Sequence, residues 1–327
     1  MRHTSLDMRQ LQMFIATAEE RSMSAAALKL GTTQSAVSQG VRNLEEELGV
    51  VLFDRMCRPL QLTPAALTLL NRGRVLLSES AQIRSEVLEA SLGISPEVSI
   101  GLVDSFAATC GPHFIKRLLE RTVHLAVRSG LTHALGEQLL SRELDIVVTT
   151  DPLDGLDDWV DRRIYSEPMI VLTPKSIKAW RLKTLDAKAV RRLASAMPLI
   201  RFNTKSQLGI QVETLLRRLE VRAAPRLEVD TADTLAAMVA AGLGWALTTP
   251  SCLVQGLQHA PDVHVAMLQG IHADRSLYLL GREGEHAKLF ETAYEAACDS
   301  VVHALLPALK GLAPQLAGSI QCGWVPR

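Results

Sequence analysis

One face of a short helical segment near the N-terminus carries side chains that can read DNA. The segment from residue 34 to about residue 48 is expected to be a helix, and Thr32 or Thr33 can cap it. Gln can pair with adenine through two hydrogen bonds, Ser can contact a base or a phosphate, and Arg favours guanine or phosphate. A helix N-terminus also favours phosphate. The spacing therefore predicts a DNA-reading face that consists of Thr33, Gln34, Ser35, Ser38, Gln39 and Arg42.

Two helices must precede this segment to position it. Residues 8 to 20 repeat apolar side chains at i, i+3, i+4 and i+7, and a second helix from Ala25 to about Leu30 ends at Gly31. A helix, a short turn with Gly and a second helix is the arrangement that sends the second helix into a DNA major groove. The apolar side of the third helix is expected to form a small core: Val37, Val41, Leu44 and Leu48, packed with Phe14 and Leu28.

A hairpin, or wing, is predicted after Gly49, where the chain reads VVLFDRMCRPLQLT. Arg55 and Arg58 lie near its tip and are candidates for contacts with the sugar-phosphate backbone or a minor groove. Lys plus Arg and Asp plus Glu number 35 each in the 327 residues, so DNA affinity would depend on where the arginines lie rather than on net charge. The alternative interpretation is a helix-turn-helix that contacts only protein.

The run MRQLQMFIATAEERSMSAAALKLGTTQSAVSQGVRNLEEELGVVLFDRMCRPLQLTPAA resembles the winged helix-turn-helix of LysR-type transcriptional regulators. The matching phrases are SAAALKL, TQSAVSQ, LEEELGVVLFDR and LTPA, in the same order and spacing, and a weaker resemblance continues to about residue 305. Two departures concern the third helix. Gly40 lies in its middle, which costs about 1 kcal/mol relative to Ala, and Asn43 stands where many members have a basic residue.

A long helix is predicted over residues 64 to 92. Thr63 can cap it, and Pro64 suits its first position. Leu69, Leu76 and Ile83 recur at seven-residue intervals, which favours pairing with the same helix of a second subunit. In the family that the chain resembles, this linker helix makes the dimer, and a two-fold dimer would place two recognition helices about 34 Å apart. The alternative is a helix docked on its own C-terminal domain.

Strand and helix patterns alternate after the linker and predict an α/β domain over residues 95–305. The resemblance implies a two-lobed effector-binding domain of the periplasmic-binding-protein type 2 form, with lobe I at about 95–163 and 266–305 and lobe II at about 164–265. The expected fold is thus an all-α winged helix-turn-helix domain at 1–63, the linker helix, the α/β effector domain and a peripheral tail at 306–327.

Ligands of open α/β sheets bind beyond the carboxyl ends of the strands. This rule predicts an effector site from loops of both lobes, and a small polar metabolite, such as a carboxylate, suits the hydroxyl groups at their helix starts. Asp104 and Asp151 would instead favour a cation or an amine, whereas Arg201 and Lys205 would favour an anion, and the sequence leaves this open. The predicted residues are Asp104, Ser105, Phe106, Gly130, Leu131, Thr132, Asp151, Asn203, Thr204, Ser206, Asp230, Thr231 and Thr248.

Composition and spacing argue against other functions. The five cysteines include no CxxC pair and the nine histidines no metal-binding spacing, so no cofactor and no metal are predicted. A redox-responsive regulator that senses through a cysteine such as Cys110 is the alternative function. A solute-binding protein or a metabolic enzyme is more distant, because nucleotide, hydrolase and zinc motifs are missing, and the GLGW turn at Gly242 ends a helix rather than starting one.

The sequence therefore predicts a transcriptional regulator, not an enzyme, that binds double-stranded operator DNA under control of a small-molecule effector. The expected partners are RNA polymerase and a second copy of the chain, in a homodimer or homotetramer. No apolar run long enough for a signal peptide or a membrane span is present, so a cytoplasmic protein without a membrane partner is expected.

Overall fold

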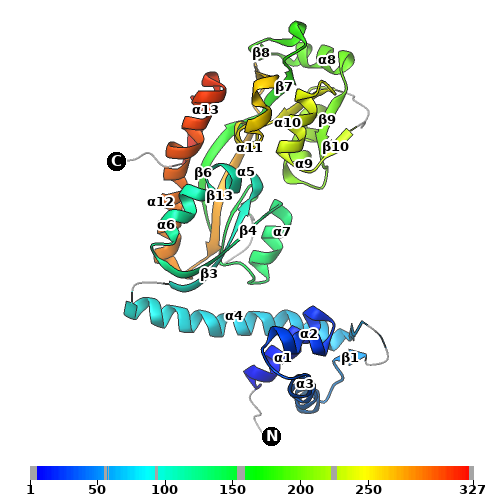
Figure 1. The fold of residues 1–327 in the computed structure, drawn as a ribbon, viewed down its shortest axis with the longest axis vertical. Helices are drawn as coiled ribbons and strands as arrows, with labels where there is room; N and C mark the ends of the chain where they lie inside the picture. The colour runs from blue at the N-terminus through cyan, green and yellow to red at the C-terminus, as the bar shows by residue number, and fades with distance from the viewer. Residues whose placement is uncertain are drawn as a thin grey trace. The chain divides into compact units, whose positions relative to one another are not determined.

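The chain forms two compact units, Met1–Ala90 and Ser91–Arg327. The structure is a computed structural model and describes residues 6–54, 57, 59–92, 95–152, 159–221 and 227–323. Figure 1 shows the helices and strands of both units.

Three short helices, a two-stranded hairpin and one long helix make up unit 1. Their bounds are α1 Met8–Glu20, α2 Met23–Lys29, α3 Gln34–Leu48, β1 Phe53–Asp54, β2 Gln61–Leu62 and α4 Pro64–Leu92. Each of the first three helices starts at a side-chain cap, because Asp7, Ser22 and Thr33 accept hydrogen bonds from backbone N–H groups of the following turn. The antiparallel pair β1–β2 confirms the predicted hairpin after α3.

The core of unit 1 confirms most of the predicted apolar stripe. Phe14 is fully buried, and its ring lies 5.5 Å from that of Phe53 in the hairpin. Two predicted core residues were wrong: Leu28 is 86% exposed and Leu48 37% exposed. The helix α2 turns the small side chains Ala26 and Ala27 inward, so Leu28 points away, and Leu48 is the last residue of α3 before the Gly49 cap.

The helix α4 is 29 residues long, which corresponds to about 43 Å. Near its start Gly73 is buried where α4 packs on α1, and a Cβ there would lie 2.8 Å from a methyl carbon of Leu11. Leu69 is half-buried against the core of unit 1, whereas Leu76 and Ile83 are 41% and 64% exposed. The seven-residue repeat therefore leaves the core of its own unit and continues onto an open face.

Unit 2 contains two six-stranded mixed sheets with helices on them. The first has the order β14-β6-β13-β5-β3-β4 and the second β10-β9-β11-β7-β12-β8, and we call them, with their helices, lobe I and lobe II. The first-sheet strands are β3 Ser95–Val103, β4 Thr122–Gly130, β5 Ile146–Thr149, β6 Trp159–Pro168, β13 Asp274–Arg282 and β14 Gln321–Cys322. Those of the second sheet are β7 Ile170–Pro174, β8 Thr184–Leu185, β9 Leu199–Phe202, β10 Leu227–Val229, β11 Trp245–Thr248 and β12 Val263–Leu268.

The helices of unit 2 cover both sheets, and in Figure 1 α6 and α12 lie on one side of the first sheet and α7 on the other. Their bounds are α5 Asp104–Thr109, α6 Gly111–Leu118, α7 Thr132–Leu140, α8 Ala187–Ala196, α9 Gln207–Arg218, α10 Ala232–Ala240, α11 Pro250–Gln255, α12 Ala287–Ser300 and α13 Leu306–Leu312. A π-helical turn at Val301–Leu305 joins α12 to α13, and short 3-10 turns lie at Lys178–Trp180, Leu257–Asp262 and Pro314–Leu316.

The two points at which the chain passes from one lobe to the other differ from the predicted boundaries. The predicted change of lobe near residue 164 falls inside β6, and the return near residue 266 falls inside β12. The chain instead crosses after Pro168 and again between Leu268 and Asp274. The returning strand β13 joins the first sheet, where it runs antiparallel to β5 and β6 and makes the sheet mixed.

The C-terminal stretch was predicted to be peripheral, and this was wrong for the residues up to 323. Leu309 and Leu316 are fully buried in the core of unit 2, and β14 pairs with β6. Apolar residues at helical spacing continue from α12 through the π turn into α13, so the helix remains in the core despite Pro307.

The GLGW turn has the predicted role of a helix end and packing turn. Gly242 follows α10 with a φ of +81°, which favours glycine, and Trp245 starts β11. A Cβ at Gly244 would lie 2.3 Å from the carbonyl oxygen of Pro198, so only glycine lets these two backbone segments approach.

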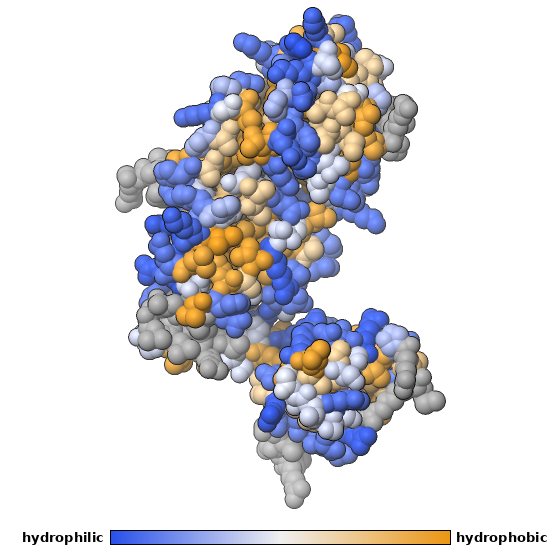
Figure 2. All heavy atoms as spheres, in the orientation of Figure 1, coloured by the Kyte–Doolittle hydropathy of each residue, from blue (hydrophilic) through white to orange (hydrophobic). Residues whose placement is uncertain are grey.

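One edge of the first sheet exposes apolar side chains. The edge strand β4 pairs with β3 alone in the part of the chain that the structure describes, and Val123 and Val127 are exposed on it, with Leu119 just before it. Figure 2 shows hydrophobic atoms gathered over α6 and β4 in unit 2. Such an edge is open to pairing with another chain.

Candidate functional sites

The predicted DNA-reading residues share the exposed face of α3. Gln34, Ser35, Gln39 and Arg42 are exposed, and Ser38 is half-buried, while the apolar stripe of the same helix is fully buried against α1. The hydroxyl of Thr33 caps the backbone N–H of Ala36 at 3.2 Å. The face is therefore free to approach a partner along the helix, although its role in DNA contact stays a prediction.

The side-chain amide of Gln39 is held in place on this face. Its Nε2 donates a hydrogen bond of 2.7 Å to Oδ1 of Asn43, one helical turn later. The Gln39 carbonyl oxygen and its second amide proton remain available. Asn43, noted in the sequence as a departure from the family pattern, thus acts as a support for Gln39.

Gly40 lies in the middle of α3, at the point where this helix packs closely on α1. It is buried, and a Cβ at this position would lie 2.3 Å from Sδ of Met13. The close approach explains a residue that costs about 1 kcal/mol in helix propensity relative to Ala. The wing residues Arg55 and Arg58 lie outside the described residues.

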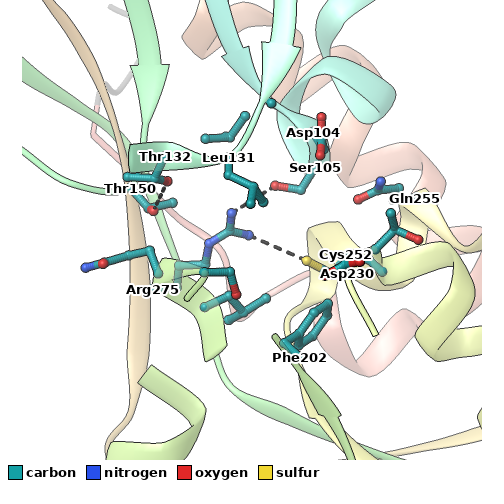
Figure 3. A pocket seen from close by; sticks show the side chains of 17 residues that line it. Asp104, Ser105, Leu131, Thr132, Thr150, Phe202, Asp230, Cys252, Gln255 and Arg275 are labelled. Atoms are coloured by element: carbon teal, nitrogen blue, oxygen red, sulfur yellow. Dashed lines mark hydrogen bonds between the residues drawn. The ribbon is translucent and has the colours of Figure 1, made fainter. Parts of the chain in front are cut away.

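A cleft between lobes I and II forms a second candidate site, shown in Figure 3. It encloses about 490 Å³ of space, including its open mouth. Lobe I contributes the start of α5, the start of α7, Thr150 and Arg275, and lobe II contributes the starts of α9 and α10 and the residues Phe202, Cys252 and Gln255. Four helix N-termini therefore face one compact cavity, which adds partial positive charge to it.

Eight of the predicted effector residues line this cleft: Asp104, Ser105, Gly130, Leu131, Thr132, Ser206, Asp230 and Thr231. The rule about carboxyl ends of strands placed them correctly in space. Whether they contact an effector stays a prediction.

Five other predicted residues do not line the cleft: Phe106, Asp151, Asn203, Thr204 and Thr248. Phe106 belongs to the helix α5 rather than to a loop, and it is buried with its ring 5.5 Å from that of Phe114. Asn203 lies behind the cleft and donates a hydrogen bond of 2.8 Å from its Nδ2 to Asp230. Nor do Arg201 and Lys205 line the cleft, and Arg201 pairs with Glu213.

Arg275 is the principal cleft residue that sequence reasoning missed. The rule searched the carboxyl ends of parallel strands, whereas β13 is antiparallel, so its first residues lie at the same edge as the ends of β3, β4 and β5. An Arg at the start of a strand that returns to a parallel sheet was the available signal. Thr150, Phe202 and Cys252 were also missed as members of the site.

Arg275 and Glu167 form a buried ion pair at the crossing between the lobes. They face each other in the β6–β13 register and are 5% and 1% exposed, with Nη1 of Arg275 3.2 Å from Oε1 of Glu167. The backbone N–H and the hydroxyl of Ser251 in α11 donate to the same carboxylate at 2.8 and 2.7 Å. Nη2 of Arg275 donates to the Ser105 hydroxyl in α5 at 3.0 Å.

The ion pair joins elements of both lobes through one guanidinium group. Figure 3 shows this guanidinium at the centre of the cleft, between Ser105 and Cys252. On one wall the hydroxyl groups of Thr132 and Thr150 lie 2.8 Å apart and form a buried hydrogen bond. The cleft thus combines fixed donors with two lining carboxylates, Asp104 and Asp230.

The lining of the cleft contains groups of both charges. Glu167 neutralises Arg275, so the carboxylates of Asp104 and Asp230 remain as two formal negative charges on the lining. The four helix N-termini carry about half an elementary charge each, so by formal count their positive charge equals the negative charge of the two carboxylates. The two carboxylates lie on opposite lobes, so a positive group placed between them could contact both.

Cys110 has the surroundings of an unreactive thiol. It lies between α5 and α6 rather than in a loop, is fully buried, and burial raises its pKa to about 11. Reactive cysteines have lowered pKa values and are accessible. The redox alternative therefore loses its candidate sensor.

Comparisons with known proteins match both units of the chain. The profile of the bacterial regulatory helix-turn-helix protein, lysR family, matches residues 8–67, and that of the LysR substrate binding domain matches residues 92–324. The HTH-type transcriptional regulator BbuR of Bordetella bronchiseptica is 28% identical over 250 residues, which cover 76% of this chain and 75% of BbuR.

Two solved structures share the fold at low sequence identity. Full-length OxyR from Pseudomonas aeruginosa, in a cysteine-to-aspartate form, has a TM-score of 0.68 at 21% identity and covers 92% of this chain and 96% of its own. Full-length CbnR in complex with its target DNA has a TM-score of 0.63 at 21% identity and covers 90% of this chain and all of its own. Within the described residues, no helix is long and apolar enough to cross a membrane.

Replacing Glu167 by Gln should destabilise unit 2 by about 3–5 kcal/mol, because the substitution leaves the Arg275 cation buried without its counter-charge. Urea unfolding followed by tryptophan fluorescence measures this, since Trp159, Trp180 and Trp245 lie in unit 2 and residues 1–90 contain no tryptophan. The matched control is Glu291→Gln, which breaks the exposed pair with Arg162 and should cost at most about 1 kcal/mol. Equal losses in the two variants would show that the buried pair has no special role.

Alkylation should leave Cys110 unmodified in the folded protein. With a pKa of about 11, roughly one Cys110 thiol in a thousand is ionised at pH 8, and the fraction rises only as the pH approaches the pKa. Mass spectrometry after brief iodoacetamide treatment should find the half-exposed Cys57 modified first and Cys110 modified only after unfolding. A sulfenic acid trapped at Cys110 in folded protein after peroxide treatment would restore the redox alternative.

Proposed function

The chain belongs to the LysR family of DNA-binding transcriptional regulators, and from this premise we propose how its residues read DNA, pair subunits and hold an effector. The proposed function is regulation of transcription from a partly palindromic operator, under control of a small molecule in the interlobe cleft. The observation that carries the DNA-reading part is the exposed polar face of α3 opposite a fully buried apolar stripe.

Residues of α3 would divide the work of DNA recognition. Gln39 has one face of its amide fixed by Asn43, which lowers the entropy lost when the amide pairs with a base edge. Thr33 and Ser35 lie at the helix N-terminus, and their hydroxyl groups are 3.0 Å apart, a placement that suits a phosphate. Arg42 on the same face suits guanine or phosphate, and Arg55 and Arg58 remain sequence-based candidates for backbone contacts.

Two exposed apolar surfaces support a homo-oligomer. The open stripe of α4, with Leu76 and Ile83, suits pairing with the same helix of a second subunit. The edge strand β4, with Val123 and Val127, offers a second contact, and two different contacts are what a dimer of dimers needs. A dimer would also present two α3 helices to one operator. This would double the few cationic contacts that a chain of zero net charge can offer to DNA.

The effector that we infer is a small polar molecule with an amino or other cationic group. Asp104 from lobe I and Asp230 from lobe II would bind this group together, so the ligand would bridge the lobes. The apolar side chains Leu131 and Phe202 would cover the rest of a compact ligand. A dicarboxylate would meet two carboxylates and no free guanidinium.

An effector acts through its unequal affinity for two arrangements of the protein. A ligand that bridges Asp104 and Asp230 favours the arrangement in which the lobes are close. In an oligomer this preference would change the spacing of the DNA-reading helices, and with it the bending of DNA and contact with RNA polymerase. The activity would be regulatory rather than catalytic and would take place in the cytoplasm, where a bacterial regulator meets the chromosome.

Replacing Gln39 by Ala should reduce the preference for the operator over unrelated DNA by about 1–3 kcal/mol, because it removes a base contact and leaves phosphate contacts intact. The test is binding of the protein to its own upstream intergenic DNA, by footprinting and titration across a salt series. The matched control is Glu46→Gln, an exposed residue in the last turns of the same helix, which should leave the preference unchanged. Equal weakening by Gln39→Ala on every DNA sequence would refute its base-reading role.

A thermal-shift screen of amino acids, polyamines and dicarboxylates should find ligands among the amines. Asp230→Asn should raise at least tenfold the amine concentration that produces a given thermal shift. The reason is that the substitution removes one of the two charges that would bind the amine. Asp233→Asn is the control, because Asp233 lies on α10 but does not line the cleft. A dicarboxylate that stabilises the protein while amines do not would overturn the proposed effector class and leave the DNA-reading role intact.

A further inference from the structure

Three side chains of types that can bind metal ions lie close together on the surface of lobe I, away from the residues that line the cleft. His113 comes from α6, Asp299 from the last turn of α12, and His303 from the π turn after it. Figure 1 shows α6 and α12 side by side, which brings together residues 186 positions apart in sequence. One ligand atom from each residue lies within 4.8 Å of the others.

The three side chains already form a hydrogen-bonded cluster. Nε2 of His113 lies 2.8 Å from Oδ2 of Asp299, and Nδ1 of His303 lies 3.0 Å from Oδ1 of the same carboxylate. The two imidazole rings stack, with centroids 5.7 Å apart and planes at 13°. Each oxygen of the Asp299 carboxylate therefore lies next to an imidazole nitrogen. The protons of these hydrogen bonds lie between the atoms that would bind a metal ion.

The backbone of this region positions the ligands. Asp299 and His303 are four residues apart and lie on one face of the helix, where the helix widens into the π turn Val301–Leu305. Single π turns inside α-helices are frequent at functional sites. Nδ1 of His303 also lies 3.0 Å from the backbone oxygen of Asp299, and this nitrogen would exchange that contact for the metal ion on binding.

We propose that His113, Asp299 and His303 bind a divalent late first-row transition-metal ion, such as Zn²⁺. Two imidazole nitrogens and one carboxylate oxygen form a ligand set that suits Zn²⁺, Ni²⁺ or Co²⁺, whereas Mg²⁺ and Ca²⁺ prefer oxygen ligands alone. With metal–ligand distances of about 2.0–2.2 Å, the ligand atoms must come to within about 3.3 Å of one another. Small side-chain rotations bring this about, because all three side chains are at least one-third exposed.

The charges around the cluster restrict the ion further. Arg117, one turn after His113 on α6, is close enough to favour the charged form of Asp299 and would repel a second cation. An ion held mainly by charge would therefore bind weakly here. An ion that binds imidazole nitrogen strongly overcomes this repulsion, and water would complete its coordination.

The other histidine–carboxylate pairs that the structure describes have only two members. His133 and Glu137 lie 3.4 Å apart on α7, four residues apart as Asp299 and His303 are, and no third ligand joins them. His124 with Glu97 and His259 with Asp233 are likewise pairs. Three convergent ligands increase affinity over two because the ion binds to groups already held together.

An ion at this site would join α6 to the helix that continues through the π turn into α13. The helix α13 packs against α11, which carries Ser251, the residue that donates twice to Glu167. The metal would therefore stabilise an element that supports the interlobe ion pair without occupying the cleft. It would act as a second input to the protein, independent of the proposed effector.

The test is calorimetric titration of chelator-treated full-length protein with Zn²⁺, together with the visible spectrum of the Co²⁺ form. We expect one ion per chain, a thermal stabilisation by Zn²⁺, and at least tenfold weaker binding in His303→Ala and in His113→Gln. His303 is largely exposed, so its replacement should leave the fold intact. The matched control is His133→Ala, which should bind Zn²⁺ as the unaltered protein does.

Each variant is compared with its own metal-free form, so a change in basal stability does not affect the result. If His133→Ala weakened Zn²⁺ binding as much as His303→Ala does, the ion would be bound by surface histidines in general. This result would refute the site. A Co²⁺ spectrum with a strong thiolate charge-transfer band would assign the ion to cysteines and would also refute it. Failure to bind metal would leave the DNA-reading and effector roles untouched.

Discussion

Glu167 and Arg275 are charged groups buried between the two lobes, and their pairing determines how these lobes can pack. Moving each ion out of water costs several kcal/mol, and the pair recovers this cost only when additional hydrogen bonds satisfy both groups. Ser251 from α11 donates to the Glu167 carboxylate and Ser105 from α5 accepts from Nη2 of Arg275, whereas Nε of Arg275 is buried without a hydrogen-bond partner in the described structure. The charged pair at the crossing strands therefore specifies the positions of two helices that surround the cleft.

This constraint also determines what a ligand can find in the cleft. The guanidinium of Arg275 lies in the lining, but its charge is already used within the protein, so it cannot attract an anion as a free arginine would. Asp104 and Asp230 stand on opposite lobes with no such internal counter-charge in the lining. The packing of the lobes thus takes up the guanidinium charge of the cleft, and the proposed effector is bound by the two carboxylates instead.

Local sequence patterns were sufficient for unit 1 but not for the cleft. The helices around α3 and their caps could be predicted because spacing of three and four residues reports directly on a helix face, and only Leu28 and Leu48 were misplaced. The cleft depends on topology: Ser105 and Thr231 followed from a rule about strand ends, whereas Arg275 required knowledge that β13 runs antiparallel. The cluster of His113 with Asp299 depends on the packing of α6 on α12, which no local pattern contains.

The crossing of α1 and α3 at Gly40 separates two properties of the DNA-reading helix. On the buried side Met13 packs against Gly40, and this contact helps to set how α3 crosses α1 in the helix-turn-helix. The polar side chains that a partner could contact lie on the exposed side. Under the proposed function, substitutions at Gln34 or Gln39 would change the preferred operator with little effect on folding, whereas a side chain at position 40 would have to displace the Met13 side chain. Such a helix lets a gene duplicate acquire a new set of target promoters by a few exposed changes while the protein remains folded throughout.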